Sequence, residues 1–452
     1  MKITSLIGLE LNALDVMIIT HLPYSLQQKI NKRRLNKIIK YARNNSSYYH
    51  DIIPDNFSSL NDIPVTTKSK MMENYNQIVT DHRITKDFVI EQMTNNPDTH
   101  KILGKYSLAA SSGSTGNPVL CLQDNSMSQR LFVSLINYCH FPCAMLCRPG
   151  YGIFNVAHDS NSASKLVSLL SKTYSSLLPP TELAKQFNKD KPRAIMSYGS
   201  LLGNVADIAD DGLLKINPKV IMASGDRLSP SCRNRLAKHY PKAQILACYA
   251  CTEGGVLAVE CSEGHMHVRE DMVEIQPLNE KWETLPDGVT SDYVAITNYF
   301  NFVQPVIRYV LDDRIVMHHG CSCGNKSPWI ELEGRSAGQW NFVRLDGTVQ
   351  KVSTLVMLNI IHSITDDTLH YFSKYQLVFH EGNENLIEFR LNLYPDVTKE
   401  ETLGLIEKSF NDYLVPLNIK AKYVIADIPP QITTHTGKLK CFLVEKDGRI
   451  IS

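Results

Sequence analysis

A run of serine, glycine and threonine at residues 111–118 is the first segment whose composition could do chemistry. Its sequence is Ser-Ser-Gly-Ser-Thr-Gly-Asn-Pro. Glycine lets a backbone approach a ligand closely, and hydroxyl groups and exposed N–H groups can surround phosphate oxygens. The spacing is not that of a Walker A loop, nor that of a Gly-x-Ser-x-Gly nucleophile elbow. By composition alone, a plain surface loop is the alternative to a phosphate-binding loop.

Two further segments carry thiols and imidazoles at a spacing that suits a metal ion. The first contains Cys261, His265 and His267, and the second is the pair Cys321 and Cys323, which is followed by glycine. Three thiolates and one histidine would form a tetrahedral zinc site, which is structural when no coordination position is left open. The alternative is a set of free side chains. A redox dithiol fits less well, because Cys-x-Cys is not the Cys-x-x-Cys of redox motifs.

The segment at residues 194–253 is expected to position a ligand, because strand and helix patterns alternate along it. We expect strands at 194–198, 219–224 and 243–250, and the second intervening helix begins at Ser229 with proline at its first position. Short links between such elements favour a parallel sheet that is covered by helices. Ligands bind beyond the carboxyl ends of the strands in such sheets.

Polar residues at those carboxyl ends form a candidate ligand pocket. Ser224, Gly225 and Asp226 follow one strand, and Tyr-Ala-Cys-Thr-Glu at 249–253 ends another. The candidate contacts for a substrate on the neighbouring segments are Tyr151, Phe154, Tyr198 and Gly199. Aromatic side chains in these segments would suit a ligand with an aromatic ring, although aromatics at such spacing are more often core residues.

The pattern changes after Gly334 and Arg335 toward a smaller unit. We expect two strands, a helix and a further strand, at 375–380, 386–393, 399–415 and 419–426. The chain is therefore divided into a large domain at residues 1–334 and a small domain at residues 335–452, whose length is typical of a separate unit. The fold class is α/β, with an α+β C-terminal domain.

Composition indicates a folded, cytoplasmic chain. Of 452 residues, 43% are apolar, and 47 Lys and Arg nearly balance 46 Asp and Glu. This balance gives no general reason to expect nucleic acid as a partner. No apolar run reaches the about 20 residues of a membrane span. The 11 scattered cysteines argue against a secreted disulfide framework.

One stretch departs from this charge balance. Residues 25–50 are basic, and their apolar residues recur at helical spacing, which predicts an amphipathic helix. A surface helix with a solvated basic face is favoured over membrane binding.

The order of the motifs resembles that of the adenylate-forming superfamily, the acyl-CoA synthetases and their relatives. Residues 111–118 resemble its phosphate loop, 249–253 its Tyr-x-x-Thr-Glu motif and 305–313 its Arg-Tyr-x-x-x-Asp motif. Gly-Arg at 334–335 resembles its hinge, and Thr-Gly-Lys at 436–438 its C-terminal catalytic lysine motif. The resemblance covers nearly the whole chain.

Within that superfamily the chain resembles the phenylacetate–CoA ligase-like proteins. Asp-Ile-Pro-Val-Thr-Thr-Lys at 62–68 is similar to the Ile-Pro-x-Thr-Lys signature of this subgroup, and Tyr-Tyr at 48–49 fits as well. Such relatives often have a cysteine, a Gly-x-His and a later Cys-x-Cys-Gly in this order, and His267 fits that pattern better than His265. The resemblance thus supports a structural Zn²⁺ held by Cys261, His267, Cys321 and Cys323.

The resemblance implies a ligase with a large multi-sheet N-terminal domain and a small mobile C-terminal domain. Such an enzyme uses ATP and Mg²⁺ to convert a small carboxylic acid into an acyl-adenylate. It then transfers the acyl group to a thiol, for which coenzyme A is the first candidate. A carrier-protein phosphopantetheine or an amine is the alternative acceptor, and a catalytically inert binding protein is the alternative from another class. The resemblance does not decide whether the protein is a monomer or an oligomer.

It also implies roles for individual residues. Tyr249 would stack on adenine, Thr252 would bind the α-phosphate and Glu253 would hold Mg²⁺. Asp313 would accept hydrogen bonds from the ribose hydroxyls, and Arg335 would reach phosphate or ribose. The remaining implied positions are Lys438 for catalysis and, for the nucleotide, Ser112, Gly113, Ser114, Thr115, Gly116, Ser224, Gly225 and Asp226.

Overall fold

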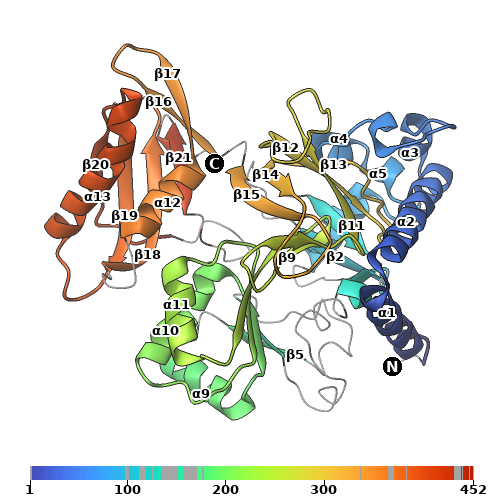
Figure 1. Cartoon of the computed structure of the whole chain (residues 1–452), viewed down its shortest axis with the longest axis horizontal. Helices are drawn as coiled ribbons and strands as arrows, with labels where there is room; N and C mark the ends of the chain where they lie inside the picture. The colour runs from blue at the N-terminus through green and yellow to red at the C-terminus, as the bar shows by residue number, and fades with distance from the viewer. Residues whose placement is uncertain are drawn as a thin grey trace.

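The computed structural model consists of a larger region and a smaller region (Figure 1). The blue, green and yellow segments build the larger region, and the orange and red segments after β15 build the smaller one. The structure describes residues 3–96, 101–110, 119–124, 127–131, 133, 151–155, 171–175, 178–335, 338–364, 371–382, 384–431, 439, 441–446 and 448–450.

A nine-stranded sheet forms the centre of the larger region, with the strand order β14-β15-β10-β9-β8-β7-β6-β4-β5. The strands from β5 to β8 are parallel, and those from β8 to β14 are antiparallel. The parallel strands are β4 (Tyr151–Asn155), β5 (Ser171–Ser175), β6 (Ala194–Ser197), β7 (Val220–Ser224) and β8 (Gln244–Cys251). The others are β9 (Gly255–Glu260), β10 (Met266–Val268), β14 (Asp313–His318) and β15 (Trp329–Arg335).

The predicted alternation of strands and helices at residues 194–253 is confirmed. A buried apolar cluster joins the helices α9, α10 and α11 to β6 and β7. These helices are α9 (Pro180–Asp190), α10 (Gly199–Asp210) and α11 (Pro230–His239). The Cys232 N–H donates a hydrogen bond to the Ser229 hydroxyl at 3.1 Å, so Ser229 caps α11 as the sequence predicted.

The prediction of one helix over residues 25–50 is wrong in one respect, because the structure contains two helices there. Ser46 adopts an extended conformation with φ −129° and ends the first helix. Its hydroxyl accepts a hydrogen bond from the Tyr49 N–H and donates one to the Gln77 carbonyl at 2.7 Å. These two hydrogen bonds stabilise the break between the two helices. The N-terminal helices are α1 (Ile3–His21), α2 (Tyr24–Asn45), α3 (Ser47–Ile52), η1 (Leu60–Asp62), α4 (Lys68–Glu73), α5 (Tyr75–Ile78) and α6 (Lys86–Asn95).

Two three-stranded antiparallel sheets complete the larger region. One contains β1 (Lys101–Ile102), β2 (Tyr106–Ala110) and β3 (Leu120–Gln123). The other contains β11 (Val273–Leu278), β12 (Tyr293–Asn298) and β13 (Tyr309–Leu311). The largest apolar cluster combines residues of α2, α3, β9 and β12, so the N-terminal helices and the sheets share a core.

The smaller region has its own apolar core, all of whose buried members lie between residues 340 and 419. Residues 372–425 form two strands, a helix and a further strand, which confirms the order of elements that the sequence predicted. A hairpin, a helix and two C-terminal strands were not predicted. The elements are β16 (Gln339–Val343), β17 (Val349–Ser353), α12 (Thr354–Ile364), β18 (Phe372–His380), β19 (Leu386–Leu393), α13 (Lys399–Leu414), η3 (Val415–Leu417), β20 (Lys422–Ile425), β21 (Phe442–Lys446) and β22 (Arg449–Ile450).

Among the described residues, no helix combines the length and the hydropathy that crossing a bilayer would require.

Two glycines of α10 provide a matched test of how this helix packs against the loop after β7. A Cβ atom on Gly199 would lie 2.3 Å from the Arg227 carbonyl oxygen, whereas a Cβ on Gly203 would meet nothing within 4 Å. Alanine in a helix is favoured over glycine by about 0.8–1.0 kcal/mol. Gly203→Ala should therefore raise the melting temperature slightly, and Gly199→Ala should lower it by several degrees. Thermal unfolding followed by circular dichroism measures both, and equal shifts would contradict the packing at Gly199.

Candidate active site

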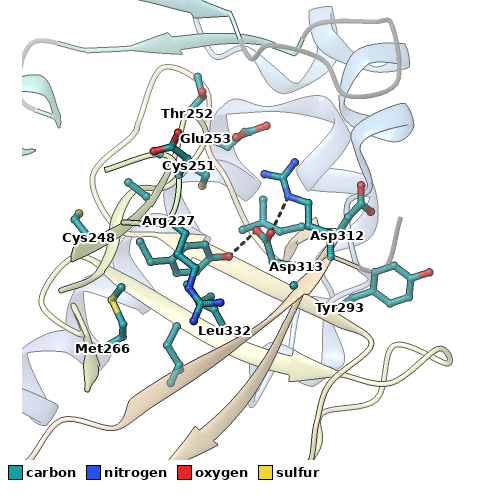
Figure 2. Close-up of a pocket in the computed structure, with 18 of the residues that line it drawn as sticks. Arg227, Cys248, Cys251, Thr252, Glu253, Met266, Tyr293, Asp312, Asp313 and Leu332 are labelled. Atoms are coloured by element: carbon teal, nitrogen blue, oxygen red, sulfur yellow. Dashed lines mark hydrogen bonds and ion pairs between the residues drawn. The ribbon is translucent and has the colours of Figure 1, made fainter. Parts of the chain in front are cut away.

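A cavity of about 2090 Å³ lies between the larger and smaller regions. Its walls come from the N-terminal end of α4, the loop after β7, the strands β8, β14 and β15, and α12. The hydrogen bond from Arg227 Nη1 to Asn359 Oδ1, at 3.3 Å, joins the loop after β7 to the smaller region. Several of the candidate residues that the sequence predicted line this cavity (Figure 2).

Asp313 is held from two sides. The Tyr249 hydroxyl donates to Asp313 Oδ2 at 2.8 Å, and Arg335 Nε donates to Asp313 Oδ1 at 3.1 Å (Figure 2). Asp313 and Arg335 are direct partners in the β14–β15 register, so the antiparallel pairing brings them together. Burial, and then the negative charge of Asp313, raises the pKa of Tyr249 well above its ordinary value, which keeps the phenol protonated as a donor.

Glu253 is a buried carboxylate at the turn between β8 and β9. The Tyr309 hydroxyl donates to Glu253 Oε1 at 3.0 Å. Desolvation raises the pKa of Glu253 above its ordinary value, while the Tyr309 hydrogen bond and the charge of Lys68 act in the opposite direction. A cation at this wall of the cavity would relieve the cost of the buried charge, and carboxylate oxygens are the ligands that Mg²⁺ prefers.

The turn that carries Thr252 and Glu253 is fixed by its neighbours. Gln123 Nε2 donates to the Thr252 carbonyl at 3.2 Å, and Asn298 Nδ2 donates to the Gly254 carbonyl at 2.8 Å. A Cβ on Gly254 would lie 2.6 Å from Ile296 Cδ1, so the turn packs tightly on β12. Thr252 is thereby presented to the cavity next to Glu253.

Arg308 has a structural role that its place in the Arg-Tyr-x-x-x-Asp motif did not reveal. The residue is buried and has a φ of +44°, which side chains other than glycine rarely adopt. Its guanidinium donates from Nη1 to the Ile63 carbonyl at 2.6 Å and from Nη2 to the Trp282 carbonyl at 3.2 Å. These bonds fix the segment that leads into α4 and so bring Lys68 to the cavity wall. Sequence reasoning gave Lys68 no role, although it ends the motif at 62–68.

The carboxylate of Asp226 accepts hydrogen bonds from the N-terminal end of α10. Its oxygens accept from the Gly199 N–H and, at 2.6 Å, from the Ser200 hydroxyl. The carboxylate therefore complements the positive N-terminal end of α10. Gly225 has a φ of +85°, and a Cβ there would lie 2.8 Å from Tyr198 Cε1, so the Tyr198 ring packs on this turn. Tyr198, Gly225 and Asp226 line the cavity, and Gly199 and Ser224 adjoin them in sequence.

Several predicted site residues cannot be placed in the same way. Ser112, Gly113, Ser114, Thr115, Gly116 and Lys438 lie outside the described residues, and so do the side chains of Tyr151 and Phe154, whose backbone belongs to β4.

The predicted thiol and imidazole groups lie close together on β10 and on the loops that follow β9 and β14. One ligand atom each from Cys261, His267, Cys321 and Cys323 lies within 4.8 Å of all the others. Cys261 Sγ is 3.9 Å from Cys321 Sγ, and Cys323 Sγ is 3.3 Å from His267 Nε2. Tetrahedral zinc, with sulfur at about 2.3 Å and nitrogen at about 2.0 Å, would separate such atoms by about 3.8 and 3.5 Å. The donor set therefore fits the ion.

The two histidines differ in their surroundings. His267 Nδ1 donates to the Ser327 carbonyl at 2.9 Å, which leaves Nε2 directed at the thiols. His265 stacks on Trp329 with ring centroids 4.0 Å apart, and its Nδ1 lies 3.2 Å from Cys321 Sγ. The structure therefore groups His267 with the three cysteines, as the sequence predicted, and leaves His265 as a neighbour of the cluster.

Comparison with known proteins identifies the architecture. No family model matches the sequence, and no curated protein matches it significantly. A 2-hydroxyisobutyryl-CoA ligase in the postadenylation state, in complex with 2-HIB-AMP, is similar in structure with a TM-score of 0.65 and 15% identity, over 94% of this chain and 91% of that chain. The chain has the two-domain adenylate-forming fold.

Two further solved structures agree. The same ligase in the thioesterification state, with 2-HIB-AMP and CoA, gives a TM-score of 0.53 at 15% identity, again over 94% of this chain and 91% of that chain. An A-PCP structure of McyG with phenylalanyl-adenylate gives 0.52 at 14% identity, over 78% of this chain and 69% of that chain.

The burial of Glu253 leads to a prediction about stability and pH. Because the pKa of Glu253 is raised by burial, ionisation of this carboxyl destabilises the folded protein. Glu253→Gln should raise the melting temperature by about 1–3 °C above the raised pKa. The gain should vanish as the pH falls below the ordinary pKa of about 4.3, where both side chains are neutral. Thermal unfolding across this pH range measures the effect.

Glu274→Gln is the matched control. Glu274 is half-buried, and its pKa is also raised by desolvation; it accepts a hydrogen bond from the Tyr299 hydroxyl at 2.9 Å, but it belongs to β11 and does not line the cavity. Both variants should show the same pH-dependent stabilisation, while Glu253→Gln alone should lose activity, by roughly 10²-fold. Equal activities of the two variants would contradict a role for Glu253 at the site.

Proposed function

We propose that this chain activates a carboxylic acid with ATP and transfers the acyl group to a thiol, with coenzyme A as the first candidate. The observation that carries the proposal is the meeting of Glu253 with the Tyr249–Asp313–Arg335 group in one cavity of an adenylate-forming fold. The division into domains at residues 1–334 and 335–452 belongs to the same proposal, since β15 ends at Arg335 and β16 begins at Gln339.

The chemistry places defined demands on these residues. A carboxylate oxygen attacks the α-phosphorus of ATP, the bond to the bridging oxygen breaks, and pyrophosphate leaves with its electron pair. A thiolate then attacks the acyl carbon, and AMP leaves. Glu253 would hold Mg²⁺, which neutralises phosphate charge. Asp313 would accept the ribose hydroxyls while Tyr249 and Arg335 hold its carboxylate in place, and Thr252 would bind the α-phosphate.

The proposal extends to the class of acid that is activated and to the acceptor of the acyl group. The motif at residues 62–68 supports a phenylacetate–CoA ligase-like enzyme, and the Tyr198 ring at the cavity supports an aryl or arylacetic acid. A carrier-protein phosphopantetheine is the second candidate acceptor, because one similar structure is an A-PCP protein with a bound adenylate. We place the enzyme in the cytoplasm because none of the cysteines that the structure describes takes part in a disulfide.

Acid-dependent exchange of labelled pyrophosphate into ATP tests the proposal directly. A panel of aryl, arylacetic and short 2-hydroxy acids should contain at least one acid that supports exchange. Coenzyme A, free phosphopantetheine and an amine can then be offered to the enzyme with that acid. Exchange without any of these acceptors would establish the adenylate step, and absence of exchange with the whole panel would favour the inert binding protein.

We also propose that Cys261, His267, Cys321 and Cys323 hold one structural Zn²⁺. All four coordination positions come from the chain, so no position is left for a substrate. The two halves of the cluster are 60 residues apart in sequence. An ion there would close this loop and fix β14 and β15, which carry Asp313 and Arg335, near the hinge.

Lys438 provides a kinetic prediction for the catalytic step. Lys438→Ala should lower the adenylation rate by roughly 10² or more while ATP affinity stays nearly constant, because the charge acts mainly on the transition state. Pyrophosphate exchange and calorimetric ATP binding measure the two quantities. Lys446→Ala, which changes an exposed lysine of β21, is the control and should leave both unchanged. Parallel losses of rate and ATP affinity in Lys438→Ala would contradict the assignment.

The zinc proposal predicts that metal content and stability change together. Purified protein should contain about one zinc per chain, and Cys321→Ser should lower both the zinc content and the melting temperature. Cys441→Ser, which alters a cysteine outside the cluster, is the matched control and should keep the zinc. Elemental analysis and thermal unfolding measure these changes. Zinc-free protein after purification without chelator would refute the proposal, and zinc loss in His265→Ala but not in His267→Ala would change the ligand assignment.

A further inference from the structure

The first helix presents apolar side chains to the solvent. Leu11, Leu14, Met17 and Ile18 of α1 are 61%, 55%, 46% and 51% exposed. Their spacing of three, three and one residues places them on one face of a helix. A cluster of this kind on a folded surface marks an interaction site more often than a chance arrangement does.

The orientation of this face is fixed by contacts on the other side of α1. Val16 and Ile19 are buried, and Asp15 accepts from Arg34 Nη2 at 2.6 Å and from Arg130 Nη1 at 2.5 Å. Arg130 is itself buried and lies over the Phe300 ring at 3.9 Å. The helix is therefore tied to the core by a partly buried ion-pair group, and its apolar residues point outward while it is docked.

The neighbouring helix presents positive charge. Its outward row starts with Leu26, which is 42% exposed, and continues along the helix with exposed basic residues. These are Lys29, Lys32, Arg33, Lys37 and Lys40. Residues 16–50 contain seven Lys and Arg and no Asp or Glu, although the whole chain has a net charge of +1. The remainder of the chain is therefore net acidic, and the positive charge is concentrated on the helix that directly follows the apolar face of α1 in the sequence.

We propose that α1 and α2 form a docking surface for an anionic phospholipid bilayer. The apolar face of α1 would enter the boundary between headgroups and acyl chains, and the basic row of α2 would lie against the headgroups. Both helices lie at the edge of the molecule opposite the smaller region, so docking leaves the cavity between the regions open (Figure 1). The proposal is independent of the proposed catalytic activity, because none of these residues belongs to the site.

Charge favours a membrane over a second copy of this chain. In a symmetric dimer through α1, the same surface patch faces itself, and two basic α2 rows would be brought near each other. An anionic bilayer satisfies both features, since it offers an apolar interior and negative headgroups. The attraction to headgroups is screened by salt, which gives the proposal a second readout.

Flotation of the full chain with lipid vesicles tests the proposal. The protein should bind vesicles that contain phosphatidylglycerol and not vesicles of phosphatidylcholine alone, and added salt should weaken the binding. The double variant Leu14→Ser, Ile18→Ser and the double variant Lys29→Glu, Arg33→Glu should each reduce binding more than about tenfold. The matched control is Leu345→Ser with Lys351→Glu, two exposed residues of the smaller region, which should bind as the wild type does.

Circular dichroism and the oligomeric state complete the design. Each changed side chain is exposed, so the variants should melt like the wild type, and the salt dependence of the wild type is a test that needs no variant. Absence of binding to anionic vesicles would overturn the proposal, and so would equal binding to both kinds of vesicle. A dimer that Leu14→Ser, Ile18→Ser converts to a monomer, without vesicle binding, would assign the face to a second copy instead.

Discussion

The carboxylate of Asp313 is the point on which the candidate site depends. It lies at the start of β14, accepts from Tyr249 on β8 and from Arg335 at the end of β15, and so ties together three strands of one sheet. Arg335 is also the last residue of β15, where the chain passes from the larger region to the smaller one. A single carboxylate therefore links the adenine side of the proposed nucleotide site to the connection between the two regions, and its orientation is set before any ligand binds.

The burial of Glu253 explains why the residues around it are fixed by several hydrogen bonds. Glu253 is placed where its charge is unfavourable, and the Tyr309 hydroxyl and the nearby Lys68 offset part of that cost. Tyr309 follows Arg308, whose unusual backbone conformation is stabilised by hydrogen bonds to two carbonyls on distant segments. Strain and buried charge at a site are consistent with function, because packing for stability alone would not retain them.

The sequence predicted the parts of this protein that depend on local pattern. The parallel strands at residues 194–253 and the cap at Ser229 follow from residue types and spacing, whereas the choice of His267 as the partner of the three cysteines came from the resemblance to phenylacetate–CoA ligase-like proteins. The Tyr249–Asp313 bond could not be predicted, because it depends on how β8 and β14 are placed in a nine-stranded sheet. The split at Ser46 depends on a contact with Gln77 far along the chain. The β16–β17 hairpin carried a usable signal, the Asp-Gly turn at 346–347, which was not used.

Asp313 is proposed to bind the ribose of a nucleotide, and this role can be tested by comparing two nucleotides on two proteins. Calorimetry can measure binding of ATP and of 2′,3′-dideoxy-ATP to the wild type and to Asp313→Asn. A hydrogen bond to a charged acceptor contributes about 1.5–3 kcal/mol, so the wild type should prefer ATP by more than about tenfold. Asp313→Asn should lose most of that preference. An equal preference in both proteins would show that Asp313 does not bind the ribose.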